Sequence, residues 1–140
     1  MPGLRPFHLA IPVADLVAAR AFYGELLECP EGRSAAQWVD FDFFGHQLVC
    51  HQVEHHDSVA GRNPVDGESI PVPHFGVVLT RAQWDAAAAR FRSVGHRFVV
   101  APTVRFEDTP GEQATFFVAD PSGNVLEFKA FADLDQLFAR

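Results

Sequence analysis

Basic residues are scarce in this chain. Its 140 residues include 11 Lys and Arg against 18 Asp and Glu, which gives a formal net charge of −7. Binding to a phosphate backbone needs a concentrated basic face, so we expect no nucleic-acid partner. No apolar run approaches the roughly 18 residues of a membrane-spanning helix, and the first 13 residues lack the charged-then-apolar order of a signal peptide. We therefore expect a cytoplasmic protein with no membrane partner.

Cysteine is scarce as well, since the chain contains only Cys29 and Cys50. The two residues could pair in principle, but a protein of this size that is not exported rarely depends on a disulfide. Cys50 falls inside an apolar segment of strand length. We expect it to be a small buried residue.

Apolar residues are abundant, at 48% of the chain, and 14 of them are Phe. A chain of this length can bury about two thirds of its unfolded surface around one core. We therefore predict a single globular domain over residues 1–140. Ten Pro and ten Gly occur at fairly even intervals, as expected where many short strands meet turns. This pattern favours an α+β fold.

The first part of the chain reads as a strand, a helix and further strands. Residues 7–13 form an apolar run of strand length, and Asp15 offers an N-cap to a helical pattern that follows. Segments 37–44 and 46–53 read as strands around a turn. If the weak segment near Glu31 adds a short strand, the order is β-α-β-β-β.

The second part repeats this order. A strand over residues 72–79 precedes a helix for which Thr80 and Gln83 form a capping box. Gly95 is the expected C-terminal cap. Three further strands are predicted over 98–106, 112–118 and 125–130.

Local matches support an internal duplication. FHLAIPVADL aligns with HFGVVLTRAQ, and DFFGHQLV aligns with DPSGNVLE. We predict a first module over about 5–55 and a second over about 70–131, followed by a tail, 132–140, that adds a short helix. Between the modules, segment 54–69 is polar and without periodicity, and we interpret it as a long surface loop that is either a connector or a lid.

Three polar residues interrupt apolar strands at corresponding positions. His8, His74 and Glu127 each alternate with apolar neighbours, so their side chains should point away from the helix layer. Two imidazoles and one carboxylate that converge would hold one divalent metal ion with open coordination positions, as in non-haem Fe(II) oxygenases. A single strand His is more often exposed or bonded to the backbone, and Glu127 could instead pair with Arg105. The shared register of all three residues favours the metal site.

The motifs resemble those of the vicinal oxygen chelate superfamily, which includes glyoxalase I, extradiol dioxygenases, fosfomycin-resistance enzymes and bleomycin-resistance proteins. FHLAIPVADLVAARAFYGELL resembles the family's first strand and helix, PHFGVVL resembles the opening of its second module, and ADPSGNVLEFKAF resembles its closing turn and strand. The resemblance covers nearly the whole chain. It implies two βαβββ modules that form an incomplete, cup-like β-barrel with helices outside, and metal-ligand roles for His8, His74 and Glu127.

One position departs from the glyoxalase I pattern. The fourth ligand that glyoxalase I enzymes generally add would fall on Val49, which cannot bind a metal. His51 lies two residues further on, on the same face, and could serve as an acid or base. It is equally compatible with a polar residue at the rim of the cup. The single Tyr, Tyr23, is expected in the core.

A metal-dependent dioxygenase of the extradiol type, an oxidoreductase acting on a small vicinal-oxygen substrate, ranks first among the functions. The cofactor would be one divalent ion, with Fe(II) favoured and Mn, Ni or Zn as alternatives. A glyoxalase-like or fosfomycin-resistance-like lyase, isomerase or transferase ranks second, and a binding protein of the bleomycin-resistance type third. Aromatic candidates for the cup lining are Phe41, Phe43, Phe106, Phe116 and Phe117.

Other polar candidates are weaker. Arg105 could neutralise an anionic substrate or pair with Glu107 or Asp108. Four histidines are more consistent with solvated positions than with metal ligands: His46, His55, His56 and His96.

The resemblance also implies a homodimer. Family members of this length commonly associate edge to edge, and some exchange modules between chains. The unpaired sheet edges of a chain of this length need covering, which favours association. With exchange, His8 would come from one subunit and His74 with Glu127 from the other.

Overall fold

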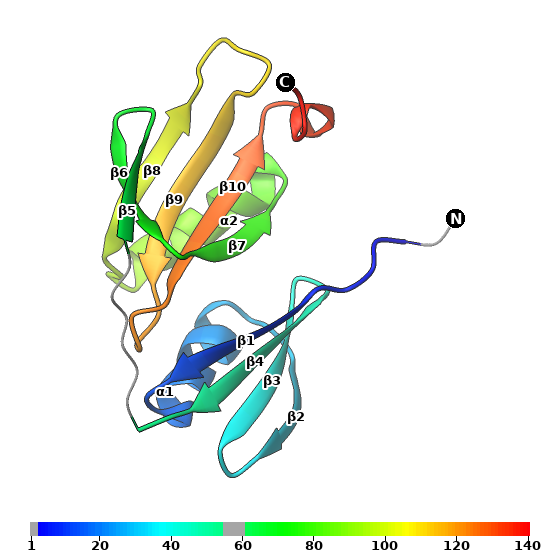
Figure 1. Ribbon diagram of the computed structural model, residues 1–140, viewed down its shortest axis with the longest axis vertical. Helices are drawn as coiled ribbons and strands as arrows, with labels where there is room; N and C mark the ends of the chain where they lie inside the picture. The colour runs from blue at the N-terminus through cyan, green and yellow to red at the C-terminus, as the bar shows by residue number, and fades with distance from the viewer. Residues whose placement is uncertain (1–2, 55–60) are drawn as a thin grey trace. The chain divides into compact units, whose positions relative to one another are not determined.

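The structure is a computed structural model that describes residues 3–54 and 61–140. The chain divides into two compact units, one formed by Met1–Ser58 with Asp120–Asn124 and the other by Val59–Ala119 with Val125–Arg140. Each unit has a four-stranded sheet with a helix against one face (Figure 1). This mixed architecture confirms the predicted α+β class and its β-α-β-β-β order.

The first unit contains a sheet of order β1-β4-β3-β2, in which β1 and β4 are parallel and the other neighbours antiparallel. The weak segment near Glu31 does form a strand, as predicted. Its elements are β1 (His8–Val13), α1 (Leu16–Ala19), the π-helical continuation η1 (Arg20–Leu26), β2 (Glu31–Ala35), β3 (Trp38–Phe43) and β4 (His46–Gln52).

The second unit repeats this topology with a sheet of order β7-β10-β9-β8, in which β7 and β10 are parallel. The repetition supports the duplication inferred from the local sequence matches. Its elements are the hairpin β5 (Gly61–Val65) and β6 (Glu68–Val72), then β7 (Phe75–Val78), α2 (Arg81–Ser93), β8 (Phe98–Arg105), β9 (Gln113–Ala119), β10 (Val125–Phe131) and the short 3-10 helix η2 (Leu134–Gln136).

The residues predicted to cap the helices do so in the structure. Asp15 accepts a hydrogen bond from the backbone N–H of Val17 at the start of α1, and Thr80 and Gln83 form a reciprocal capping box on α2. Beyond the end of α2, Gly95 adopts a φ of +69°, a conformation that favours glycine. None of the helices in the described residues is long and apolar enough to cross a membrane.

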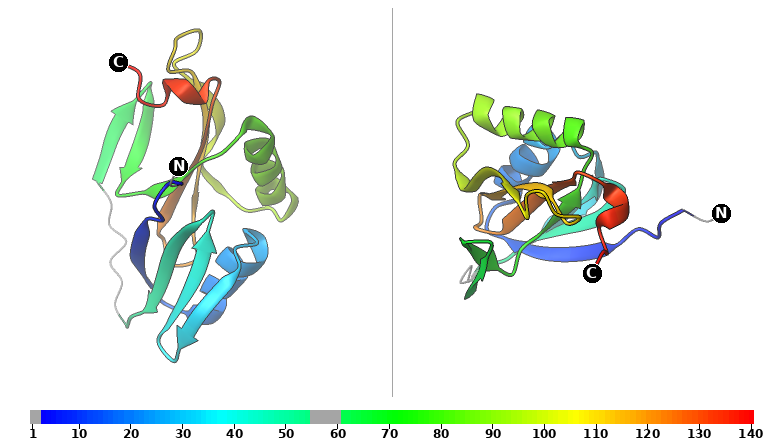
Figure 2. Two further views of the ribbon diagram at one scale, coloured as in Figure 1. Left: turned by 90° about the vertical axis from the view of Figure 1, so that its right-hand side faces the viewer. Right: turned by 90° about the horizontal axis from the view of Figure 1, so that it is seen from above.

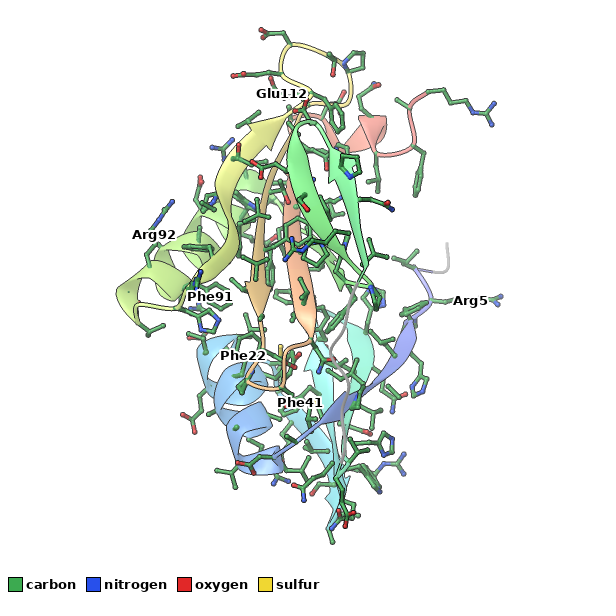
Figure 3. All side chains as sticks on the ribbon, turned by 60° about the vertical axis from the view of Figure 1, so that its left-hand side comes forward. Arg5, Phe22, Phe41, Phe91, Arg92 and Glu112 are labelled. Carbon is green, nitrogen blue, oxygen red and sulfur yellow. The ribbon has the colours of Figure 1, made fainter. Side chains whose placement is uncertain are left out.

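Each helix packs on one face of its own sheet through aromatic side chains. In the second unit, Phe91 of α2 is fully buried and contacts Phe116 and Phe128 on adjacent strands. Phe91 points towards the sheet, whereas the neighbouring Arg92 lies on the exposed side (Figure 3). In the first unit, the fully buried Tyr23 contacts Phe41 on β3. The opposite face of each sheet carries both polar and apolar side chains.

Part of the expected surface loop is a β-hairpin. The part of segment 54–69 described from residue 61 forms β5 and the start of β6, which pair around a turn at Asp66 and Gly67. Ile70 of β6 packs with Val100 and Phe117 of the sheet. The hairpin therefore lies on the face away from α2 (Figure 2). Residues 55–60 of the expected loop lie outside the described residues.

The strand expected over residues 72–79 is interrupted. Val72 ends β6, the Val72–Pro73 peptide bond is cis, and β7 begins only at Phe75. His74 therefore precedes its strand instead of lying within it. Gly76 faces the backbone of Glu127 so closely that a Cβ atom would lie 1.6 Å from the Glu127 carbonyl oxygen. Only glycine permits β7 to approach β10 at this point.

The turn Asp120–Asn124 joins β9 to β10 but belongs to the first unit by its contacts. Tyr23 donates its phenolic hydrogen bond to Asp120 Oδ2 over 2.8 Å, and burial together with this carboxylate raises the pKa of Tyr23. Asn124 Nδ2 donates to the Pro12 carbonyl, and the Ala14 N–H donates to Ser122 Oγ. The turn thus completes the hydrogen bonding of the first unit.

Candidate metal site

Two of the three predicted ligands are in direct contact. His74 Nε2 and Glu127 Oε1 lie 3.2 Å apart on the sheet face of the second unit that points away from α2. His74 approaches from the segment before β7, and Glu127 is the third residue of β10, where it pairs with Gly76 of β7. The parallel pairing of these strands therefore brings the two side chains together.

Glu127 is a buried carboxylate, with 5% of the residue exposed. Its Oε2 accepts a hydrogen bond from Thr115 Oγ1 at 2.5 Å, and Lys129 Nζ lies 3.7 Å from Oε1. Burial alone would raise the pKa of this carboxyl group. The hydrogen bonds from His74 and Thr115 and the charge of Lys129 outweigh burial, so the pKa of Glu127 is lowered and the group is anionic.

His74 is held by a hydrogen bond from each ring nitrogen. Its Nδ1 lies 2.6 Å from the Pro71 carbonyl oxygen, which can only accept, so Nδ1 carries a hydrogen. The contact with Glu127 is the main cause that raises the pKa of His74, and it outweighs the lowering by burial. Without a metal, Glu127 therefore favours the protonated imidazole.

The donor geometry fits a divalent ion. Two ligand atoms that bind one ion at about 2.1 Å and at a right angle are about 3.0 Å apart. The 3.2 Å between His74 Nε2 and Glu127 Oε1 is close to this separation. The Pro71 carbonyl fixes the Nδ1–H tautomer that leaves Nε2 available once its proton is lost, an arrangement usual for histidine ligands. Imidazole nitrogen and carboxylate oxygen suit Fe, Mn, Ni or Zn.

His8 has the same kind of support in the first unit. Its Nδ1 lies 2.8 Å from Gln47 Oε1, while Gln47 Nε2 donates to Asp40 Oδ2 over 3.2 Å. Because the amide oxygen can only accept, His8 Nδ1 donates and Nε2 of the neutral ring is left with its lone pair. Asp40 orients Gln47, and Gln47 orients His8.

The three predicted ligands come from both units of the chain. His8 belongs to the first unit, and His74 and Glu127 belong to the second. Across residues 3–54 and 61–140, no three His, Cys, Asp or Glu side chains are grouped closely enough to hold a metal. The three-residue ligand set remains a prediction, while the contact between His74 and Glu127 is observed.

Strand pairing explains the difference between the two modules. Gly76 pairs with Glu127 in the second sheet, and Ala10 pairs with Val49 at the corresponding place in the first. Val49 therefore occupies the position at which a fourth ligand was sought. His51 is exposed and lies four residues along β4 from Gln47, the partner of His8. At about 3.3 Å per residue this is about 13 Å along the strand from the His8 position, so His51 does not contact His8, and its role as an acid or base stays a prediction.

The expected aromatic lining is only partly on the correct face. Phe41 and Phe43 are buried and share the face of β3 that packs on the helix, because Phe41 contacts Tyr23. Phe116 likewise contacts Trp84 and Phe91 of α2. These three residues are core and do not line the cup, contrary to expectation. The prediction failed because alternation fixes which residues share a face but does not say which face is concave.

Phe117 lies on the predicted face. It is fully buried, and its ring contacts His74 edge to face at a centroid distance of 4.9 Å. Phe106 follows β8 and is 41% exposed. A cleft of about 310 Å³ opens at the pair His74 and Glu127, which we call the metal-site pair. It is lined by His74, Phe75, Gly76, Val77, Val78, Glu127 and Lys129.

Two of the remaining histidines form hydrogen bonds with backbone groups. His46 Nδ1 accepts a hydrogen bond from the Phe7 N–H, and His96 Nε2 lies 2.9 Å from the Ala119 carbonyl oxygen. His55 and His56 lie outside the described residues. Of the alternative partners considered for Arg105, the structure shows Glu127, whose Oε2 lies 3.8 Å from Nη1, and not Glu107 or Asp108.

Four supporting residues were missed in the sequence: Asp40, Gln47, Thr115 and Lys129. The signal that identifies them is strand register. Gln47 is the partner of His8, and Thr115 lies diagonally across from Glu127 on the neighbouring strand, so both share the face of the ligand. A sequence that locates the strands without their pairing does not reveal these neighbours.

Comparison with known proteins agrees with this architecture. The family model of the Glyoxalase/Bleomycin resistance protein/Dioxygenase superfamily matches residues 5–128. A glyoxalase/bleomycin resistance protein/dioxygenase from Alicyclobacillus acidocaldarius is 35% identical over 96% of this chain and 96% of that one, with a TM-score of 0.81. No curated protein matches the sequence significantly.

More distant structures share the fold. The genomically encoded fosfomycin resistance protein FosX from Listeria monocytogenes is 18% identical over 97% of this chain and 98% of that one, with a TM-score of 0.64. Lactoylglutathione lyase from Agrobacterium tumefaciens is 20% identical over the whole of both chains, also with a TM-score of 0.64. The match over residues 5–128 and the repeated βαβββ topology establish that this chain belongs to the Glyoxalase/Bleomycin resistance protein/Dioxygenase superfamily.

Proposed function

We propose that the protein is a metal-dependent enzyme whose ion is held by His8, His74 and Glu127. The observation that carries this proposal is the contact between His74 Nε2 and the buried carboxylate of Glu127 at 3.2 Å. Hydrogen bonds to Pro71 and Thr115 fix both groups. Superfamily members generally use a divalent metal ion, which is consistent with this donor set.

The reaction proposed first is an extradiol-type dioxygenation of a small substrate with vicinal oxygens. A bound Fe(II) would supply the redox chemistry and the open coordination positions. The chain's own contribution is to orient the ligands and to exclude water. Phe117, which is fully buried, packs edge to face against His74 and helps to hold the imidazole in place.

His74 has a second task in this proposal. Where His74 is protonated, which its contact with Glu127 favours, the Nε2 hydrogen must leave before the nitrogen can bind an ion. Metal uptake therefore releases a proton. The Nδ1–H keeps its hydrogen bond to the Pro71 carbonyl, and this bond holds the ring in place while Nε2 loses its hydrogen and binds the ion.

The test is metal analysis of protein purified without added metal, followed by oxygen uptake with a panel of catechols after loading with Fe(II). We expect about one ion per chain and oxygen consumption that depends on the catechol. Glu127→Ala should release the metal while circular dichroism still reports the folded state. Tight metal binding without oxygen uptake would reject the dioxygenase and favour a lyase or transferase in which the metal acts as a Lewis acid. Failure to bind any divalent ion would reject the metal site and leave the small-molecule binding protein.

A further inference from the structure

Arg105, the last residue of β8, is buried and incompletely bonded. Only 4% of the residue is exposed, yet its Nε and Nη2 atoms have no hydrogen-bond partner. Among residues 3–54 and 61–140 these are the only buried side-chain nitrogen or oxygen atoms in that condition. A buried guanidinium with unmet donors is costly, because the hydrogen bonds that it lost to water are not replaced.

The rest of the guanidinium is held in place. Its Nη1 lies 3.8 Å from Glu127 Oε2, and its central carbon lies 5.6 Å from the centroid of the Phe117 ring. The ring supports the cation, and the carboxylate attracts one of its ends. Arg105 is thus positioned beside the metal-site pair, while Phe117 contacts both Arg105 and His74.

The two unmet donors belong together chemically. In a planar guanidinium, Nε–H and one N–H of Nη2 point in the same direction and form one edge, a fork that matches the two oxygens of a carboxylate. Nη1, the nitrogen nearest Glu127, is not part of that edge. The two unmet donors therefore have the geometry that pairs with an anionic group of two oxygens.

We propose that the Nε/Nη2 edge of Arg105 binds the carboxylate, or a similar two-oxygen anionic group, of an organic acid substrate. This assignment rests on the proposed function, since it names the substrate class of the same site. The anion bound at Arg105 would lie next to Glu127, so the other oxygens of the substrate would be directed towards His74 and Glu127. The substrate is then an organic acid with further oxygens near its acidic group.

The binding test uses purified full-length protein and benzoate as the probe, with benzamide as its neutral match. Benzoate should bind the wild type saturably and shift the ¹⁵N-edited Nε–H resonance of Arg105, whereas benzamide should do neither. Arg105→Lys keeps the charge but loses the fork, so it should bind benzoate at least about tenfold more weakly. The matched control is Arg97→Lys, at an exposed arginine of the same unit, which should bind like the wild type.

A further variant separates this proposal from the metal site. Glu127→Gln cannot supply the metal-binding carboxylate and also removes the negative charge beside Arg105. It should therefore lose metal but bind benzoate as tightly as the wild type or several-fold more tightly. Equal benzoate binding by wild type and Arg105→Lys, or an Arg105 resonance that benzoate does not move, would overturn the anion site. If the wild type binds no divalent metal while its benzoate binding still depends on Arg105, only the proposed function is rejected.

Discussion

The residues that hydrogen-bond to the two proposed ligand histidines determine which ring nitrogen is available to a metal. His74 uses the Pro71 carbonyl and His8 uses the Gln47 amide oxygen, and both accept a hydrogen from Nδ1. The two modules thus reach the same tautomer by different means, since one acceptor is a backbone atom and the other a side chain. A backbone acceptor cannot be removed by substitution, but Gln47 can.

Gln47→Met should weaken metal binding by about tenfold or more, because it removes the acceptor that orients His8 and leaves the size of the side chain nearly unchanged. The affinity can be measured by competition with a chelating dye. Gln37→Met, at an exposed glutamine in the same unit, should leave it unchanged. If both variants bind metal like the wild type, Gln47 has no positioning role.

The His74–Glu127 pair should make the stability of the metal-free protein depend on pH. The raised pKa of His74 contributes stability that is present below its unfolded value and is lost as pH rises through the folded value. The lowered pKa of Glu127 contributes stability that is present above its unfolded value and is lost as pH falls through the folded value. The pair therefore stabilises most in mildly acidic solution, between the ordinary pKa values of Glu and His.

Urea unfolding of wild type and His74→Gln at several pH values, with a chelator present, measures this effect. The difference in unfolding free energy should be largest near about pH 5.5, and it should shrink as pH rises through the raised pKa of folded His74 and as pH falls through the lowered pKa of folded Glu127. A difference that is constant with pH would mean that the contact is not an ion pair in solution.

At the scale of elements, the sequence predicted most helices and strands because their signals are local. Asp15, Thr80 and Gly95 cap helices wherever they occur in a suitable pattern. The β5–β6 hairpin was missed although its turn residues Asp66 and Gly67 form a strong hairpin signal. Its strands are mostly exposed and contain Pro64, so they lack the apolar alternation that identifies a strand.

The site was predicted less completely than the fold. Alternation within β10 located Glu127, whereas His74 lies just before β7 and contacts Glu127 although the strand expected around it is interrupted. Gln47 was missed, and the contact of Arg105 with Glu127 was only one of several alternatives, because both depend on which strands are neighbours and on which face is covered. The close approach at Gly76 is of the same kind, since nothing in its own strand requires glycine.

Gly76→Ala should destabilise the second unit by about 1–3 kcal/mol, because its Cβ would collide with the Glu127 backbone and force β7 away from β10. The midpoint of urea unfolding measures the loss. Gly111→Ala is the matched control, since its Cβ would meet nothing closer than a side-chain oxygen at 4.0 Å. Equal midpoints for the two variants would show that β7 can move without cost.

At the scale of the whole molecule, we propose a homodimer. In the described residues, β1 pairs only with β4 and β7 only with β10, so each sheet presents an open edge beside its ligand histidine. Such edges favour association with another strand. Light scattering should therefore give about twice the mass of the chain, and a monomer would reject this proposal.

Mixing His8→Ala with Glu127→Ala tests whether modules are exchanged in such a dimer. If each metal site combines modules from two chains, a heterodimer contains one site with both substitutions and one intact site. Refolding the mixture should then restore part of the metal binding. If each chain builds its own site, verified heterodimers should bind no metal.

The turn Asp120–Asn124 shows that the sequence repeat and the compact structural unit have different boundaries. It belongs to the second repeat in sequence and to the first unit in structure. Duplication copied a β-α-β-β-β segment, yet the first unit depends on a turn encoded in the second copy. A gene fragment that ends before this turn would leave the Tyr23 hydroxyl and the Ala14 N–H without Asp120 and Ser122 as acceptors. The first copy thus depends on a turn encoded in the second, so the first half cannot be permuted or grafted onto another protein as a self-sufficient block.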